Sequence, residues 1–252
     1  TFYETLADDP FLRNAYQNHF DLGMGGTFYY TTNPESIPKS SFFYTRLQLD
    51  VAGNLLSAFR PLMKKDANGA GMIWNTPYSQ FVRGEITIGK TWVFGQNAGH
   101  SLATRVVAGA GYAYDNSSVL PFEKHFYAGG ANSLRGWQAR TVGPGLAPMD
   151  NSFVIPNQTG DMRLEANVEY RFDLFWKIAG ALFVDAGNVW TLQDDADTDS
   201  MLSRFRADTF TESIAANWGL GIRLDLDFLL LRVDMGIKMH DPARDHKWVR
   251  PE

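Results

Sequence analysis

The chain has 252 residues, with 23 Lys and Arg against 28 Asp and Glu, a formal net charge of −5 and no cysteine. Its hydrophobic fraction of 44% excludes a disordered chain, and the acidic balance argues against nucleic-acid binding by phosphate neutralisation. Without cysteine these residues carry no disulfide framework, thiol nucleophile or thiolate metal site. The 18 Phe, 10 Tyr and 7 Trp, combined with 23 Gly, favour β-strands over helices.

The sequence has no segment that could cross a membrane as a helix. Such a helix needs about 18 or more uncharged apolar residues, and the apolar run Phe228–Leu231 is far shorter. An initiator Met and a signal-peptide segment are also lacking, so we expect a mature chain or a fragment. A membrane β-barrel remains compatible with this pattern, because its strands alternate and produce no long apolar window.

Alternation of apolar and polar residues predicts eight strands. In chain order they span 18–31, 41–59, 80–95, 101–114, 161–174, 177–190, 213–226 and 228–240. In the clearest, Met162–Leu174, seven apolar residues alternate with six polar ones, five of them charged. In the strand at 80–95, Lys90 interrupts the apolar face. Strands this long exceed the ~5–6 residues usual in soluble proteins and reach the ~9–11 of a membrane strand.

The connections between the predicted strands differ in length. The turns Asp173–Lys177 and Asp225–Phe228 are short, whereas 60–79, 115–160 and 191–212 are long and polar or rich in Gly and Pro. Outer-membrane barrels combine short periplasmic turns with long outer loops. A charged or glycine face opposite a continuous apolar face therefore predicts an all-β fold, a transmembrane antiparallel β-barrel domain over 1–252, rather than a soluble β-sandwich.

The C-terminal tail 246–252 does not have the pattern of a strand. An open sheet edge in lipid would leave backbone groups unpaired. We therefore expect these residues to be part of a larger barrel.

The segment Phe126–Trp137 carries the most informative motif of the chain. A paired glycine, Gly129-Gly130, precedes the tetrapeptide Leu134-Arg135-Gly136-Trp137. This arrangement resembles the signature loop of the BamA/TamA superfamily, the outer-membrane assembly and translocation barrels.

Two later blocks strengthen the resemblance. Leu182–Trp190 is similar to the family's Asp-x-Gly-x-x-Trp strand, and Gly219–Asp225 followed by Leu231–Asp234 is similar to its penultimate hairpin. The three blocks stand in the family's order over about 115 residues. The region before Pro121 matches the family only in style.

The resemblance implies a sixteen-stranded barrel in which the signature loop, here about 115–160, joins the eleventh strand to the twelfth. Leu102–Tyr114 would be the eleventh strand, Met162–Leu174 the twelfth and Ala179–Trp190 the thirteenth. The last two predicted strands would be the fourteenth and fifteenth, so the chain corresponds to about the C-terminal half of the barrel without its last strand. The family's periplasmic POTRA repeats are expected upstream.

The resemblance also implies a site in the lumen, where the arginine of the signature loop pairs with acidic residues on the wall. Here the arginine is Arg135, and the acids are Glu169 and Asp185 on the polar faces of neighbouring strands. Arginine can bind a carboxylate through two parallel hydrogen bonds, and removing one partner strands the other charge. The other signature-loop residues are expected to permit close backbone approach or to pack on the wall: Gly129, Gly130, Leu134, Gly136 and Trp137. Whether Arg135 only anchors the loop or takes a direct part in assembly stays open.

Catalysis and cofactor binding have no support in the sequence, so we expect neither an enzyme nor a cofactor. No nucleophile elbow, P-loop or dinucleotide motif is present. Asp194–Asp199 resembles the start of a calcium loop, but Ser200 stands in place of the required glycine and Arg206 in place of the glutamate. An acidic loop in water explains this segment better than a metal site.

The resemblance implies a function in the outer membrane of a Gram-negative bacterium, with an organelle as the less favoured location. The expected activity is the folding and insertion of unfolded β-barrel proteins into the bilayer through a lateral seam, together with accessory lipoproteins and without nucleic acid. A TamA-like factor or a two-partner secretion transporter is the alternative within the superfamily. A passive outer-membrane pore is the alternative from another class.

Overall fold

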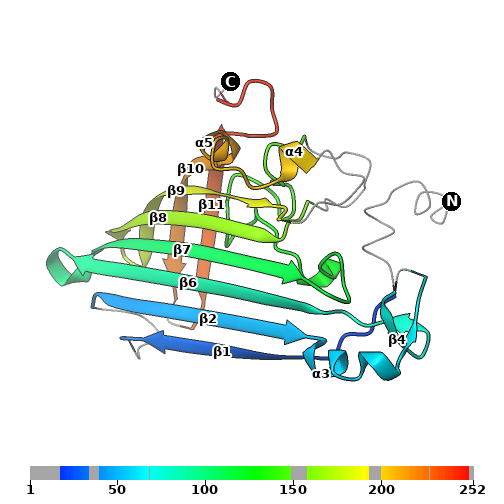
Figure 1. Ribbon diagram of the computed structural model, residues 1–252. Helices are drawn as coiled ribbons and strands as arrows, with labels where there is room; N and C mark the ends of the chain where they lie inside the picture. The colour runs from blue at the N-terminus through cyan, green and yellow to red at the C-terminus, as the bar shows by residue number, and fades with distance from the viewer. Residues whose placement is uncertain are drawn as a thin grey trace.

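The computed structural model describes residues 18–33, 40–67, 69–148, 158–192, 200–226 and 228–249. Eight strands of this part of the chain form one antiparallel sheet whose spatial order follows the sequence (Figure 1). They are β1 (Gly23–Thr31), β2 (Phe42–Ala52), β6 (Phe81–Phe94), β7 (His100–Ala113), β8 (Met162–Phe175), β9 (Ile178–Trp190), β10 (Ala215–Asp225) and β11 (Leu230–His240). Within this sheet β1 and β11 each pair with one described strand, so the sheet is open.

Short elements occupy the connections. Between β2 and β6 lie α3 (Asn54–Ser57), η1 (Arg60–Leu62) and a small sheet of β3 (Lys64–Lys65), β4 (Gly71–Ile73) and β5 (Thr76–Pro77). The others are η2 (Gln96–Ala98), η3 (Phe122–Lys124), α4 (Ser200–Ser203) and α5 (Phe210–Ser213). In the described residues, no helix combines the length and the apolar character needed to cross a bilayer.

The large sheet has two chemically different faces. On β10, Trp218, Leu220 and Ile222 are 40%, 43% and 57% exposed, whereas Asn217 and Arg223, which alternate with them, are buried. We call the face with the exposed apolar side chains the outer face and the opposite one the inner face. Because the side-chain period of a strand is two, the same alternation along the other strands makes the outer face a continuous apolar surface. Soluble monomers rarely expose an apolar patch of this extent.

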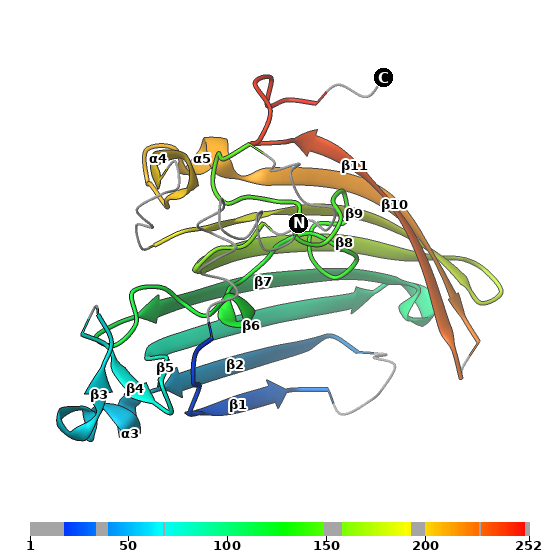
Figure 2. The same ribbon diagram turned by 90° about the vertical axis from the view of Figure 1, so that its right-hand side faces the viewer.

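The sheet is curved, and β10 and β11 turn away from the plane of the first strands (Figure 2). The long segment between β7 and β8 lies against the inner face. A Cβ atom on Gly109 or Gly111 of β7 would meet Phe126 or Leu120 of that segment at 2.6 and 2.7 Å, so these glycines make room for it. The predicted fold class is therefore confirmed as antiparallel β-sheet in the form of a partial barrel with an occupied interior.

All eight predicted strands are present, but two of their boundaries are wrong. The strand predicted over 41–59 ends at Ala52, because Gly53 takes a φ of +78° and leads into α3. The strand predicted from residue 18 begins at Gly23. In both cases the apolar residues beyond the strand belong to the connections rather than to the sheet, and Leu22, Leu55 and Phe59 are 43%, 66% and 53% exposed there.

The chain turns back after β11. Trp248 forms an antiparallel bridge with His240, and the Val249 N–H donates to the Met239 carbonyl at 3.0 Å. This pair is an isolated bridge, and no strand follows β11 in the described residues up to Val249, as expected for the tail; residues 250–252 lie outside the described residues.

Candidate functional site: the loop on the inner face

The segment between β7 and β8 is described over 114–148 and 158–161, and it packs on the inner face through an apolar cluster. Phe126, Leu134 and Trp137 are at most 6% exposed. They form one buried cluster with residues of the loop and of β9 and β10: Phe126, Ala128, Leu134, Trp137, Val142, Val189 and Ala215. The Lys238 ammonium lies 5.0 Å from the centre of the Trp137 ring, so β11 also contacts the loop.

Glycines shape the loop where its backbone turns or touches the wall. Gly129 and Gly130 have φ values of +96° and +94°, a region that favours glycine, and a Cβ on Gly129 would collide with the Gln138 carbonyl oxygen. The Gly130 N–H donates to the Trp137 carbonyl at 2.8 Å and closes the turn. A Cβ on Gly136 would lie 2.8 Å from Asn217 Cβ, so this glycine brings the loop close to β10.

Arg135 lies at the centre of the contact between the loop and the wall. Its Nε and Nη2 donate to the two carboxylate oxygens of Asp185 at 2.9 and 2.8 Å, and its backbone N–H donates to Asp185 at 3.1 Å. Nη1 donates to Glu169, and the guanidinium lies 3.4 Å from the centre of the Phe183 ring. The side chains of Arg135 and Asp185 are 7% and 0% exposed. The contact is thus bidentate and shielded from water.

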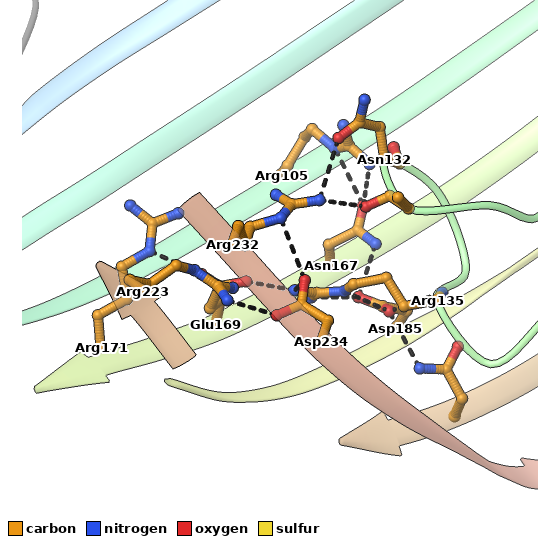
Figure 3. A network of polar contacts seen from close by, with 12 residues as sticks. Arg105, Asn132, Arg135, Asn167, Glu169, Arg171, Asp185, Arg223, Arg232 and Asp234 are labelled. Atoms are coloured by element: carbon orange, nitrogen blue, oxygen red, sulfur yellow. Dashed lines mark hydrogen bonds and ion pairs between the residues drawn. The ribbon is translucent and has the colours of Figure 1, made fainter. Parts of the chain in front are cut away.

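A second layer of charges surrounds this pair (Figure 3). Arg223 of β10 donates to Glu169 at 3.1 Å and also to Asp234 of β11, and Asp234 lies 3.5 Å from Arg135. Arg171 donates to Glu169 at 2.7 Å. Two neutral side chains, Asn167 and Asn217, donate to Asp185 at 2.8 and 3.0 Å. Arg135 is thereby connected to β8, β9, β10 and β11 at once.

The charge of Arg135 is secured by this network. Burial alone would lower the pKa of its guanidinium, but the hydrogen bonds to Asp185 and Glu169 outweigh burial and raise that pKa above its usual value. Arg135 therefore carries its charge throughout the physiological pH range.

The tip of the loop before Arg135 is held by a neighbouring group of charges. Arg105 of β7 donates to the Asn132 carbonyl at 2.5 Å, and the Ser133 hydroxyl donates to Glu165. Arg163 donates in turn to Glu165 at 2.9 Å. From the opposite side, Arg232 of β11 donates to the Ala131 carbonyl at 2.6 Å. The loop tip is clamped between β7, β8 and β11.

The structure brings together Arg135 and both carboxylates predicted beside it, and it places Leu134 and Trp137 in the buried cluster. Sequence reasoning missed Asp234, Arg223, Asn167 and Asn217. The alternation of their strands would have assigned these residues to the polar face, but only the strand register and the curvature of the sheet bring them to Arg135.

In the described ranges, no group of three or more His, Asp or Glu side chains could hold a metal ion. The acidic segment Asp194–Asp199 lies outside those ranges.

Comparisons with known proteins give three findings. The model of the Omp85 superfamily domain matches residues 18–249. The outer membrane protein assembly factor BamA of Neisseria meningitidis serogroup B is 28% identical over 109 residues, which are 41% of this chain and 13% of that protein. The crystal structure of BamA from Haemophilus ducreyi lacking POTRA domains 1–3 aligns with 86% of this chain and 50% of that one, at 14% identity and a TM-score of 0.46.

The chain thus spans about an eighth of the curated relative and half of the solved one. The family model, by contrast, covers nearly all of the chain and includes all eight strands of the large sheet and the loop on its inner face. The chain belongs to the Omp85 superfamily.

Proposed function

We propose that the protein of which these residues are part is an outer-membrane assembly factor that folds and inserts β-barrel proteins into the outer membrane of a Gram-negative bacterium. Membership of the Omp85 superfamily and the similarity to a protein named outer membrane protein assembly factor BamA support this assignment. The continuous apolar outer face, suited to contact with lipid, supports the location.

The observation that carries the proposal is the loop fixed on the inner face by Arg135. A passive pore needs an open lumen for its solutes, whereas this loop lies within the curve of the sheet. It is held by a bidentate ion pair of Arg135 with Asp185 of β9 and by contacts of Arg135 with Glu169 of β8 and Asp234 of β11. Such a loop suits a barrel whose interior stays closed while client strands are inserted at its wall.

In the proposal, insertion of strands at the wall requires no covalent chemistry and no cofactor. An unpaired strand edge offers a row of backbone N–H and C=O groups, and an incoming strand can pair with that edge by β-augmentation. In the proposal this edge belongs to a lateral seam formed by strands other than the eight described. The described strands supply the rigid wall and the loop on it.

The partners follow from the same proposal. They are unfolded outer-membrane barrel proteins, the surrounding bilayer and accessory lipoproteins, and POTRA repeats upstream of this domain would bind substrates in the periplasm. A TamA-like factor or a two-partner secretion transporter would share the domain and differ in the number of repeats and in the range of clients.

Depletion of the full-length protein in its own cell tests the proposal. We expect a broad fall in the amounts of unrelated outer-membrane barrels, measured by quantitative proteomics of isolated outer membranes. A fall in only one or a few proteins would favour the TamA-like or secretion alternative. Unchanged barrel levels, together with slower uptake of small solutes, would replace the proposal with the passive pore.

A further inference from the structure

In the eight described strands, one Lys side chain lies on the outer face of the large sheet. Lys90 of β6 pairs in register with Phe43 of β2 and Thr104 of β7, and all three side chains point to the apolar side. Every Asp, Glu and Arg in the eight described strands, and Lys238, falls on the inner face by the same registers. In the described part of the chain, no acidic side chain on the outer face is available to Lys90.

Aromatic rings follow Lys90 toward the end of β6. Trp92 and Phe94, on the same face, are 42% and 48% exposed. Phe94 stacks on His100 with 6.0 Å between ring centres, and His100 stacks on Tyr170 of β8, also at 6.0 Å. The Tyr170 hydroxyl and His100 Nδ1 are 2.9 Å apart, so this band is also linked by a hydrogen bond. In membrane proteins such bands mark the level of the lipid headgroups.

The position of Lys90 along its strand puts its ammonium group close to that level. Lys90 is four residues from Phe94, the last residue of β6. With a rise of ~3.4 Å per residue and a strand tilt of ~35–45°, its Cα lies about 10 Å inside the strand end. A lysine stem can extend from there to the headgroups, where lipid phosphates supply the negative charge that the protein surface lacks.

We propose that Lys90, with the aromatic band beside it, binds the phosphate of a membrane lipid in the leaflet at the short-turn end of the strands. An ammonium group at the edge of the hydrocarbon layer requires a counter-charge, and the described outer face offers none of its own. The inference rests on the proposed function only in placing the barrel in a bilayer, and it does not depend on insertase activity.

Native mass spectrometry of the full-length protein in detergent tests the proposal. The protein is titrated with phosphatidylglycerol or with diacylglycerol of the same acyl chains, which lacks the phosphate. We expect wild type to bind phosphatidylglycerol more tightly than diacylglycerol. Lys90 should account for a factor of about five in this affinity ratio, the contribution of one lysine at an anionic surface. Lys90→Met should lose this preference and Lys90→Arg should retain it. The matched control Lys65→Met, on the exposed small strand β3, should bind as wild type does.

The possible outcomes distinguish a lipid phosphate from a free phosphate ion. They also distinguish failure of this inference from failure of the proposed function. Equal binding of phosphatidylglycerol by wild type and Lys90→Met would overturn the inference. Displacement of the lipid by millimolar inorganic phosphate would also overturn it, because the site would then be one for a free anion. Both readouts are independent of client insertion, so a negative depletion experiment would leave them interpretable.

Discussion

Replacing Arg135 by alanine is expected to produce the largest loss of stability of any single substitution in the loop. Asp185, which is fully buried, and Glu169 would lose their charged partner. Removing one member of a buried ion pair costs about 3–5 kcal/mol, since the remaining charge stays uncompensated. The full-length barrel should therefore unfold at a clearly lower temperature, which its heat-dependent shift from the compact to the unfolded band on SDS gels will report.

Arg140→Ala is the matched control, because Arg140 lies in the same loop and has no buried acidic partner among the described residues. Its guanidinium stands 5.0 Å from the centre of the Tyr127 ring, and its backbone N–H keeps its bond to Ala128 after the change. We expect an effect within about 1 kcal/mol, typical of an exposed cation–π contact. Equal effects of the two substitutions would contradict a special role of Arg135 in holding the loop.

A double-mutant cycle isolates the pair itself. Asp185→Asn removes the charge but keeps the shape, and the coupling between Asp185→Asn and Arg135→Met measures the interaction. A reversal of charges is a weaker test, because Asn167 and Asn217 also donate to Asp185 and would face a cation after the swap. Client assembly, measured at a temperature at which Arg135→Ala stays folded, would distinguish a direct part of Arg135 from anchoring alone.

Strands were more predictable from the sequence than the connections between them. The period of two in Met162–Leu174 is enough to place β8 to within one residue, because its outer face is apolar and its inner face is polar and contacts the loop. The end of β2 was not predictable in this way. The chain beyond Gly53 continues with apolar residues, such as Leu55 and Leu56, and only the φ of Gly53 ends the strand.

The residues of the site that belong to the sequence motif were predictable. Those that only the fold brings next to the motif were not. Arg135 stands in a recognisable tetrapeptide, and the alternation of β8 assigns Glu169 to the polar face. The alternation of β11 likewise assigns Asp234 to the polar face, but nothing in the sequence indicates that it lies near Arg135. It is 99 residues from Arg135, and only the curvature of the sheet toward β11 brings the two to 3.5 Å. A contact of this kind depends on strand register, which a single sequence leaves open.

Gly236→Ala is expected to lift the loop from the wall without altering a loop residue. A Cβ on Gly236 of β11 would lie 2.6 Å from the Arg135 carbonyl oxygen and 2.8 Å from the Gly136 nitrogen. Both are backbone atoms, so no side-chain rotation relieves the overlap, and crowding of this kind typically costs about 1–3 kcal/mol. Arg135, with a side chain that is 7% exposed, should then become accessible to trypsin in the intact full-length protein. Fragment masses will report cleavage after this residue.

The same substitution on the other face is the control. Gly26 lies in β1, and a Cβ there meets nothing within 4 Å. Replacing glycine by alanine at an unstrained site typically gains about 0.4–1 kcal/mol, because the unfolded chain loses freedom. The two substitutions should therefore change stability in opposite directions, although both exchange the same atoms in a strand of the same sheet. Wild-type stability and trypsin resistance of Gly236→Ala would mean that the loop is not held against β11, and the network around Arg135 would then be limited to β8, β9 and β10.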